Sequence, residues 1–213
     1  MKKTNYALFG VIILSLILII VPKLNKPEPE SNPVTGNQPF NRSTVDTRMP
    51  DNFPEPIENA SVRVAKKPFG LFAKPGNSPV EPEHFVGFHT GTDFEILPGE
   101  ENIAVPIYAV CEGKILQKRT AQGYGGYLVQ ACTINNEPVT VVYGHLSLAS
   151  ITKNVGGEFK AKEKIGNLGQ PPTETDNERK HLHLGIHKGT GINILGYVQN
   201  ESELSNWLDF QSL

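Results

Sequence analysis

The order of apolar and polar residues divides the chain into three parts. Residues 6–21 form an almost unbroken apolar run, residues 22–60 are polar and rich in proline, and residues 61–213 alternate short apolar runs with Gly, Pro and Asn. Almost nothing in the third part repeats every 3.6 residues, the period of an amphipathic helix. The pattern therefore predicts an all-β domain over residues 61–213.

Four segments of this domain are predicted as strands because they are rich in β-branched and aromatic residues. They are residues 103–117, 124–134, 138–147 and 180–189. The segment "TAQGYGG", residues 120–126, predicts the turn between the first two. One short helix is predicted near the C-terminus, with Asn200 as its N-cap and Glu203 completing a capping box. Its apolar face would be formed by Leu204, Trp207 and Leu208.

The apolar run near the N-terminus predicts a membrane segment. As a helix, residues 6–21 would rise about 24 Å, somewhat less than the roughly 30 Å of a hydrocarbon core. A cleaved signal peptide is the alternative, but no small-x-small cleavage site follows the run and no nearby cysteine could be lipidated. With two lysines in residues 1–5, we expect an uncleaved single-pass anchor that leaves residues 1–5 in the cytoplasm and the chain after Val21 outside.

The segment after the anchor has the composition of a linker. Residues 22–60 carry eight of the 17 prolines and very few large apolar residues. Such a segment cannot bury enough surface to offset the entropy lost on ordering. We expect a Pro-rich, disordered spacer that holds the domain away from the membrane.

Charge excludes one class of partner. The chain has 20 Lys and Arg against 22 Asp and Glu, a net charge of −2, and no dense basic stripe. Nucleic acid binding requires a basic surface that neutralises phosphates. Nucleic acid is therefore not an expected partner.

The two cysteines are candidates for a disulfide. If the predicted turn is centred between Ala121 and Gln122, residues whose numbers add up to 243 face each other, and Cys111 and Cys132 satisfy this sum. Directly opposed Cβ atoms lie about 4.5–5.5 Å apart, and a modest approach would allow a bridge in an extracytoplasmic domain. Because a register slip of one residue would separate the pair, two buried free thiols are the alternative.

Three of the six histidines lie within "KHLHLGIHKG", residues 180–189. Residues two apart on a strand point to the same face, so His181 and His183 project side by side. The apolar residues of this strand point the other way, into the core: Leu182, Leu184 and Ile186. His187 would lie about 13 Å from His183 along an extended strand, too far to share a metal ion. We interpret His187 as a surface or packing residue.

A second group of polar residues lies in "GFHTGTDFEI", residues 87–96. His89 and Asp93 are four residues apart, a helical spacing, but the glycines and threonines around them disfavour a helix. We expect Gly91 to bend or bulge the chain so that both side chains turn toward one point. Two imidazoles and a carboxylate leave zinc a fourth position for water, which suits hydrolysis of an amide.

These residues resemble the signature of the lysostaphin and LytM type zinc endopeptidases, which cut peptide bonds in bacterial peptidoglycan. The ordered motifs are "HTGTD" (89–93), "YGHLS" (143–147) and "HLH" (181–183), and the resemblance covers roughly residues 67–200. It implies a LytM-like antiparallel core, the duplicated hybrid motif. It also implies one zinc ion per chain, with ligands His89, Asp93 and His183. His145 and His181 would position and deprotonate the attacking water.

Together with the predicted anchor at residues 6–21, the resemblance predicts a membrane-anchored, extracytoplasmic zinc endopeptidase that acts on peptidoglycan peptides. The alternative is a LytM-like module without catalysis that binds the cell wall or regulates an amidase, or a domain that keeps zinc for structure alone. Degenerate modules of the first kind lack ligands, and this chain lacks none of them.

The sequence departs from the family pattern in two places. The family usually has a short Gly, Ser and Thr loop ending in Gly-Pro before HLH, whereas this chain has the longer, charged "QPPTETDNERK" (170–180), where we expect its specificity to lie. Some members also have a tyrosine a few residues before the first ligand. In those members the tyrosine stabilises the oxyanion. This chain has "EPEHFVGF" there, and neither His84 nor the nearby phenylalanines can be assigned the role of stabilising the oxyanion.

Overall fold

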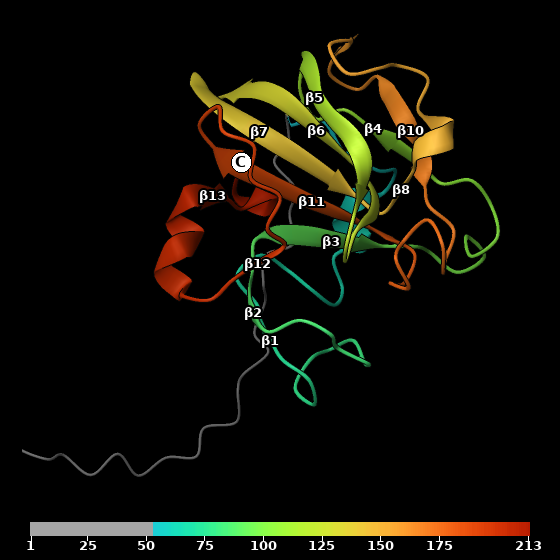
Figure 1. The fold of residues 1–213 in the computed structure, drawn as a ribbon, viewed down its shortest axis with the longest axis vertical. Helices are drawn as coiled ribbons and strands as arrows, with labels where there is room; N and C mark the ends of the chain where they lie inside the picture. Colours follow the sequence, from blue (N-terminus) through green and yellow to red (C-terminus); the bar gives the residue numbers. More distant parts are fainter. Residues whose placement is uncertain (1–52) are drawn as a thin grey trace, which may run out of the picture. The chain divides into compact units, whose positions relative to one another are not determined.

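The computed structural model describes residues 53–213, and in this part strands dominate (Figure 1). The helical segments there are short 3₁₀ turns, so the all-β prediction is confirmed. The predicted anchor (6–21) and most of the predicted linker lie outside the described residues. Within residues 53–213, no helix has the length and apolar content that crossing a membrane requires.

Short and long strands alternate with a few 3₁₀ segments along the chain. The strands are β1 (Phe72–Ala73), β2 (Gly87–His89), β3 (Gly91–Glu95), β4 (Pro106–Tyr108), β5 (Gly113–Ala121), β6 (Gly125–Ile134), β7 (Glu137–Gly144), β8 (Leu146–Ser147), β9 (Glu158–Phe159), β10 (Lys164–Leu168), β11 (His181–Lys188), β12 (Tyr197–Val198) and β13 (Trp207–Leu208). The 3₁₀ segments are η1 (Ala60–Val62), η2 (Leu148–Ser150), η3 (Glu201–Asn206) and η4 (Phe210–Ser212).

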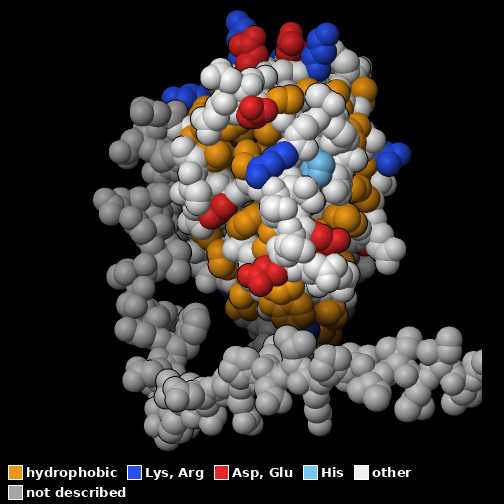
Figure 2. Space-filling view, turned by 90° about the vertical axis from the view of Figure 1, so that its left-hand side faces the viewer, with side chains coloured by type: hydrophobic (Ala, Val, Ile, Leu, Met, Phe, Trp, Pro, Cys, Tyr) orange, Lys and Arg blue, Asp and Glu red, His pale blue; other side chains and the backbone are white. Residues whose placement is uncertain are grey.

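The strands form three antiparallel sheets. The largest has the order β13-β11-β7-β6-β5-β9, with β3 also paired to β11, and the smaller ones have the orders β4-β10-β8 and β1-β2-β12. The long strands β5, β6, β7 and β11 lie side by side in Figure 1. On the face that Figure 2 shows, acidic and basic side chains are interspersed with apolar ones.

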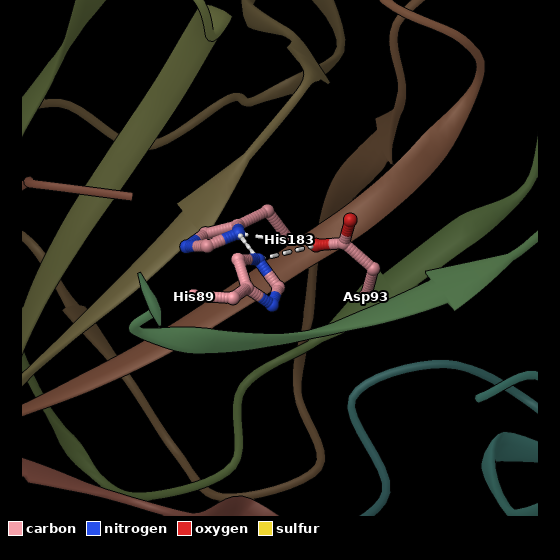
Figure 3. Close-up of side chains that lie close together, drawn as sticks. All are labelled: His89, Asp93 and His183. Atoms are coloured by element: carbon pink, nitrogen blue, oxygen red, sulfur yellow. Dashed lines mark hydrogen bonds and ion pairs between the residues drawn. The ribbon is translucent and has the colours of Figure 1, made fainter. Parts of the chain in front are cut away.

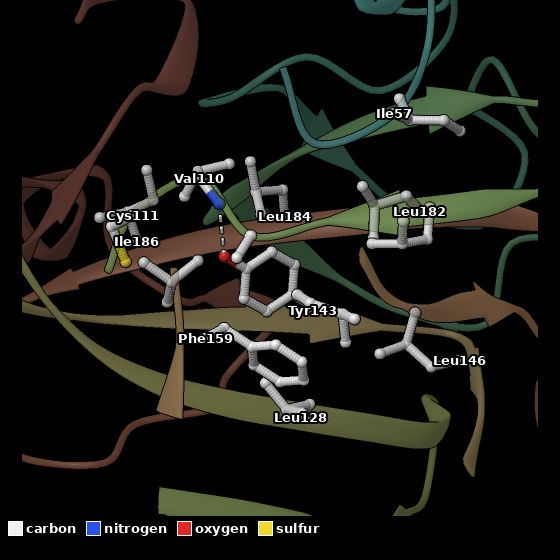
Figure 4. Packing of buried hydrophobic residues seen from close by; sticks show 14 of the residues in the cluster. Ile57, Val110, Cys111, Leu128, Tyr143, Leu146, Phe159, Leu182, Leu184 and Ile186 are labelled. Carbon is white, nitrogen blue, oxygen red and sulfur yellow. Dashed lines mark hydrogen bonds between the residues drawn. The ribbon is translucent and has the colours of Figure 1, made fainter. Parts of the chain in front are cut away.

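The core lies against the apolar face of β11, as the alternation of this strand predicts. Leu182, Leu184 and Ile186 are buried (Figure 4). Tyr143 is buried beside them, and its hydroxyl donates to the Gln130 side-chain oxygen (2.9 Å) while accepting from the Val110 N–H (3.0 Å). The polar end of this core residue is therefore satisfied, which removes the penalty of burying it.

The folded domain begins earlier than residue 61. Ile57, assigned by the sequence to the linker, is fully buried and forms an isolated β-bridge with Ile107. The ring of Phe53 packs edge-on against Phe210, with centroids 5.5 Å apart. A single large apolar residue within a Pro-rich segment has no periodic signal, so the pattern could not show that the core would bury it.

Two predicted strands are interrupted, and the predicted helix is shorter than expected. The segment 103–117 divides into β4 and β5, and 138–147 divides into β7 and β8 with His145 between them. The C-terminal segment begins as expected, because the Glu203 carboxylate accepts the Asn200 N–H (3.0 Å). It ends at Asn206, however, and Trp207 lies in β13, where it pairs with β11. Pairing with a sheet edge therefore overrides helix continuation.

The predicted register of β5 and β6 is wrong, although the cysteines meet. Ala121 faces Gly125 and Gln117 faces Val129, so facing residues add up to 246 instead of 243, and a β-bulge between Ile115 and Gln117 changes the sum to 245 where Ile115 faces Gln130. Cys111 precedes β5, in the segment that separates it from β4. From there it forms a disulfide with Cys132, with Cα atoms 5.9 Å apart.

Candidate active site

Two strand pairings bring the predicted site residues together. β3 pairs with β11 so that Asp93 lies directly opposite His183. His89 ends β2, which belongs to a different sheet and pairs with β12. The chain changes sheets at Thr90, whose N–H donates to the Gly196 carbonyl (3.0 Å). Residues four apart in sequence thus approach one point from two sheets.

His89, Asp93 and His183 converge with their polar atoms in mutual contact (Figure 3). His89 Nε2 lies 3.0 Å from His183 Nδ1 and 3.2 Å from Asp93 Oδ1. His183 Nδ1 lies 3.1 Å from Asp93 Oδ1. All three residues are buried, at 1%, 2% and 4% exposure. Two imidazole nitrogens and a carboxylate oxygen in such a cluster form a set that could hold a metal ion.

Hydrogen bonds from outside the cluster orient these side chains. His89 Nδ1 lies 3.1 Å from the Pro68 carbonyl oxygen, which leaves Nε2 to face the cluster. Asp93 Oδ2 accepts from Arg179 Nη2 (2.9 Å), which leaves Oδ1 to face the histidines. Glu95 in turn holds the guanidinium through two nitrogens, at 3.0 and 2.6 Å. Such outer contacts fix the orientation of metal ligands.

The electrostatics of the cluster keep Asp93 and His183 in the forms that bind metal at neutral pH. Burial raises the pKa of Asp93, but electrostatic attraction to His181 and His89 and the hydrogen bonds from His181 and His183 outweigh it, so this pKa lies well below its usual value. Burial lowers the pKa of His183 to about 4, although Asp93 opposes the shift. Asp93 is therefore anionic and His183 neutral near pH 7.

Gly91 is required for space and not for the bend that the sequence suggested. Its φ does not lie in the left-handed region. A Cβ built on Gly91 would lie 2.6 Å from Cε1 and 2.7 Å from Nε2 of the His183 ring, and 2.7 Å from the Leu184 carbonyl oxygen. The chain therefore needs a residue without a side chain where β3 passes the His183 imidazole.

Replacing Gly91 by alanine should weaken metal binding by about 10- to 100-fold, the loss typical of changes beside metal ligands, because the methyl group would displace the His183 ring. A competitive chelator titration measures this affinity. Gly191→Ala is the matched control, since a Cβ there meets nothing within 4 Å and its φ is unstrained. Equal affinities of the two variants would show that His183 tolerates the displacement.

His145 and His181 form a second pair beside the cluster, with ring centroids 4.1 Å apart. His181 Nδ1 donates to the Arg179 carbonyl (2.8 Å), and its Nε2 lies 3.3 Å from Asp93 Oδ2. His145 adopts φ 59° between β7 and β8, a conformation that is uncommon outside glycine and often marks functional sites. Burial and the nearby His181 charge keep the pKa of His145 well below its usual value.

A cleft opens over these five residues. Its polar lining also includes four residues that the sequence analysis did not single out: Lys67, Tyr124, Arg179 and Tyr197. Its apolar lining includes Phe85, Val86, Ile194 and Leu195. His84 is not among the lining residues. The His187 ring instead packs edge-on against Trp207, at 4.9 Å. The periodicity of the sequence could not indicate the four additional polar residues of the cleft. Tyr197 lies in a strand of only two residues, and the other three lie in loops.

The charged segment 170–180 is fastened to the fold by most of its charges. Asp176 accepts the Gly123 N–H (2.7 Å), which ties the segment to the turn between β5 and β6. Lys180 Nζ donates to the carbonyl oxygens of Glu100 (2.8 Å) and Ile103 (2.7 Å), away from the cleft. Of the whole segment, only Glu178 and Arg179 line the cleft.

The sequence profile described as Peptidase family M23 matches residues 87–194, slightly more than half of the chain. The chain belongs to peptidase family M23. The resemblance that the motifs indicated is therefore confirmed. All five converging residues lie within the matched part of this M23 domain, while Lys67 and Tyr197 lie outside it.

Solved structures of the same kind are similar to the M23 domain. LytU is 24% identical, covering 69% of this chain and 81% of its own, with a TM-score of 0.46. The catalytic domain of lysostaphin from Staphylococcus simulans is 22% identical, covering 67% and 84%, with a TM-score of 0.44. A zinc-containing peptidase from Vibrio cholerae is 24% identical, covering 66% and 37%, with a TM-score of 0.43. No curated protein matches the chain.

Proposed function

We propose that this M23 protein is a zinc-dependent endopeptidase that hydrolyses peptide bonds in bacterial peptidoglycan. The observation that carries the proposal is the spacing of the three buried polar atoms of His89, Asp93 and His183, which is 3.0, 3.1 and 3.2 Å. Ligand atoms about 2.0–2.1 Å from a tetrahedral zinc ion lie roughly 3.3 Å from one another. The donor set therefore fits one zinc ion, and all three donors line the cleft.

His89 Nε2, Asp93 Oδ1 and His183 Nδ1 would hold this zinc ion. When bound, zinc would lower the pKa of water and polarise a carbonyl group, the two effects that amide hydrolysis requires. The surrounding protein residues orient the side chains that would bind the metal. Arg179 holds the Asp93 carboxylate so that one oxygen faces the metal position.

The second histidine pair supplies the acid and base chemistry. His181 would take the proton of the attacking water at Nε2, because its Nδ1 hydrogen is held by the Arg179 carbonyl. His145, whose pKa is held low, is neutral near pH 7 and would hydrogen bond to the reacting groups at the other side. General acid-base catalysis by positioned histidines typically contributes about 10² to 10⁴ in rate.

The proposal includes a location outside the cytoplasm. The apolar run at residues 6–21 would anchor the chain as a single-pass membrane protein, and the Pro-rich residues after it would extend the domain toward the wall. The Cys111 to Cys132 disulfide supports this location, since such bonds persist in oxidising compartments. The substrate that binds in the cleft would then be a peptide of peptidoglycan.

Digestion of purified peptidoglycan by the full chain tests the proposal. We expect new peptide amino termini by mass spectrometry, no release in the presence of a zinc chelator, and recovery after zinc is added back. The masses of the fragments also identify the bond that is cut. If no fragments are released under any condition, the chain is a non-catalytic module that binds the wall or regulates an amidase.

A further inference from the structure

Tyr197 packs against one residue of the candidate metal centre and lies outside the family match. It faces His89 across the β2 and β12 pairing, and the two ring centroids are 5.2 Å apart. The side chain lines the cleft and is only partly buried. A substrate in the cleft can therefore reach this phenol. The other tyrosine of the cleft, Tyr124, has a hydroxyl that is buried away from solvent.

The hydroxyl of Tyr197 has its hydrogen available. Lys67 Nζ donates to the Tyr197 oxygen at 3.0 Å, so this contact uses a lone pair of the phenol and not its hydrogen. Among residues 53–213, the hydroxyl donates to no acceptor within hydrogen-bond distance. The ammonium group also polarises the phenol, which strengthens it as a donor.

A buried ion pair holds Lys67 in place. Its Nζ lies 2.6 Å from Glu83 Oε2, and the two residues are only 3% and 5% exposed. Glu83 is itself fixed, because it accepts from the Ser78 hydroxyl (2.7 Å) and from the Phe85 N–H (3.1 Å). The Phe85 ring also stacks on Tyr197, with centroids 5.2 Å apart. The phenol is thus held in one orientation before substrate binds.

We infer that Tyr197 donates a hydrogen bond to the oxyanion that develops on the substrate carbonyl, and that Lys67 and Glu83 are its positioning residues. The inference rests on the proposed function. The group has the properties of an oxyanion donor: an unused hydrogen, a fixed orientation and a place in the lining of the cleft beside His89. Lys67, Glu83 and Tyr197 all lie outside the matched residues 87–194.

The Tyr197→Phe variant tests this role kinetically. Loss of one oxyanion donor typically lowers kcat by about 10²- to 10³-fold, and we expect that loss with little change in KM and with the zinc content of the wild type. Tyr108→Phe is the matched control, since its phenol lies on β4 and does not line the cleft. An unchanged kcat in Tyr197→Phe would overturn the inference.

Binding of a phosphinate dipeptide gives a second readout that does not depend on turnover. This probe has the tetrahedral, anionic centre of the intermediate, so Tyr197→Phe should bind it at least about 10-fold more weakly by calorimetry. An uncleaved peptide substrate, measured in a His181→Ala background, should bind equally with and without the Tyr197 hydroxyl. Equal losses for both ligands would indicate a structural role and contradict the inference.

The Lys67→Met variant tests whether Lys67 acts by positioning the Tyr197 hydroxyl or acts independently of it. It should lower phosphinate affinity and kcat in the same direction as Tyr197→Phe, and adding it to Tyr197→Phe should cause little further loss, because both act through one hydrogen bond. Independent, additive losses would show that Lys67 does not act through Tyr197. If the wild type cleaves nothing, the proposed function fails; if it cleaves and Tyr197→Phe equals it, only this inference fails.

Discussion

Asp93→Ala should abolish both zinc binding and peptide hydrolysis. Asp93 Oδ1 contacts His89 Nε2 and His183 Nδ1 at 3.2 and 3.1 Å, so its loss would leave two neutral ligands for a divalent cation. The loss would also leave the Arg179 guanidinium without its partner at the centre, which adds a repelling positive charge. Both effects act against the metal, so this substitution has the largest expected effect.

The measurement is zinc per chain by mass spectrometry after dialysis, together with fragment release from peptidoglycan. His183→Ala should give the same double loss, because it removes another of the three ligands. Glu137→Ala is a suitable control, as it removes an exposed carboxylate at the start of β7. A variant without Asp93 that kept stoichiometric zinc would refute the assignment of the ligands.

The second large effect is expected from His181→Ala, which should keep zinc and lower turnover by about 10²- to 10⁴-fold. His181 has its Nδ1 hydrogen bonded to a backbone carbonyl, and its Nε2 approaches the outer oxygen of Asp93. It therefore stands beside the metal centre without being needed to hold the ion.

The zinc content and kcat of His181→Ala need to be compared with those of His187→Ala. His187 is on the same strand and packs against Trp207, outside the cleft, so its loss should leave both quantities near the wild type. Full activity in His181→Ala would show that the proposed base is wrong. Loss of zinc in this variant would instead make His181 a ligand.

Much of the fold follows from local rules that a sequence displays directly. The alternation in β11 predicts which residues face the core, because side chains of a strand point alternately to its two faces. The capping box at Asn200 predicts where η3 begins, because it satisfies backbone groups within four residues. Through their resemblance to a known family, the ordered motifs also predict that His89, Asp93 and His183 lie together, and these residues do converge.

Register and strand breaks are different, because they depend on small energy differences between alternative pairings. The turn is centred at Gly123 and not between Ala121 and Gln122, and a bulge lies near Ile115. As a result, every β5 residue faces a different β6 residue from the one predicted. The cysteines still met because Cys111 lies in an irregular segment that is not bound to that register. A correct contact was thus predicted from an incorrect register.

The amino-acid sequence alone determined the all-β class and the core face of β11, because these depend on residue type and short-range periodicity. The histidines and the aspartate that converge were indicated by the resemblance of the ordered motifs to a known family. Only the tertiary structure decided that Gly91 makes room for the His183 ring, that Arg179 orients Asp93, and that Lys67 donates a hydrogen bond to Tyr197. Lys67 and Tyr197 are 130 positions apart. Contacts at such separations are decided by how strands of different sheets pack, and no local pattern encodes that packing.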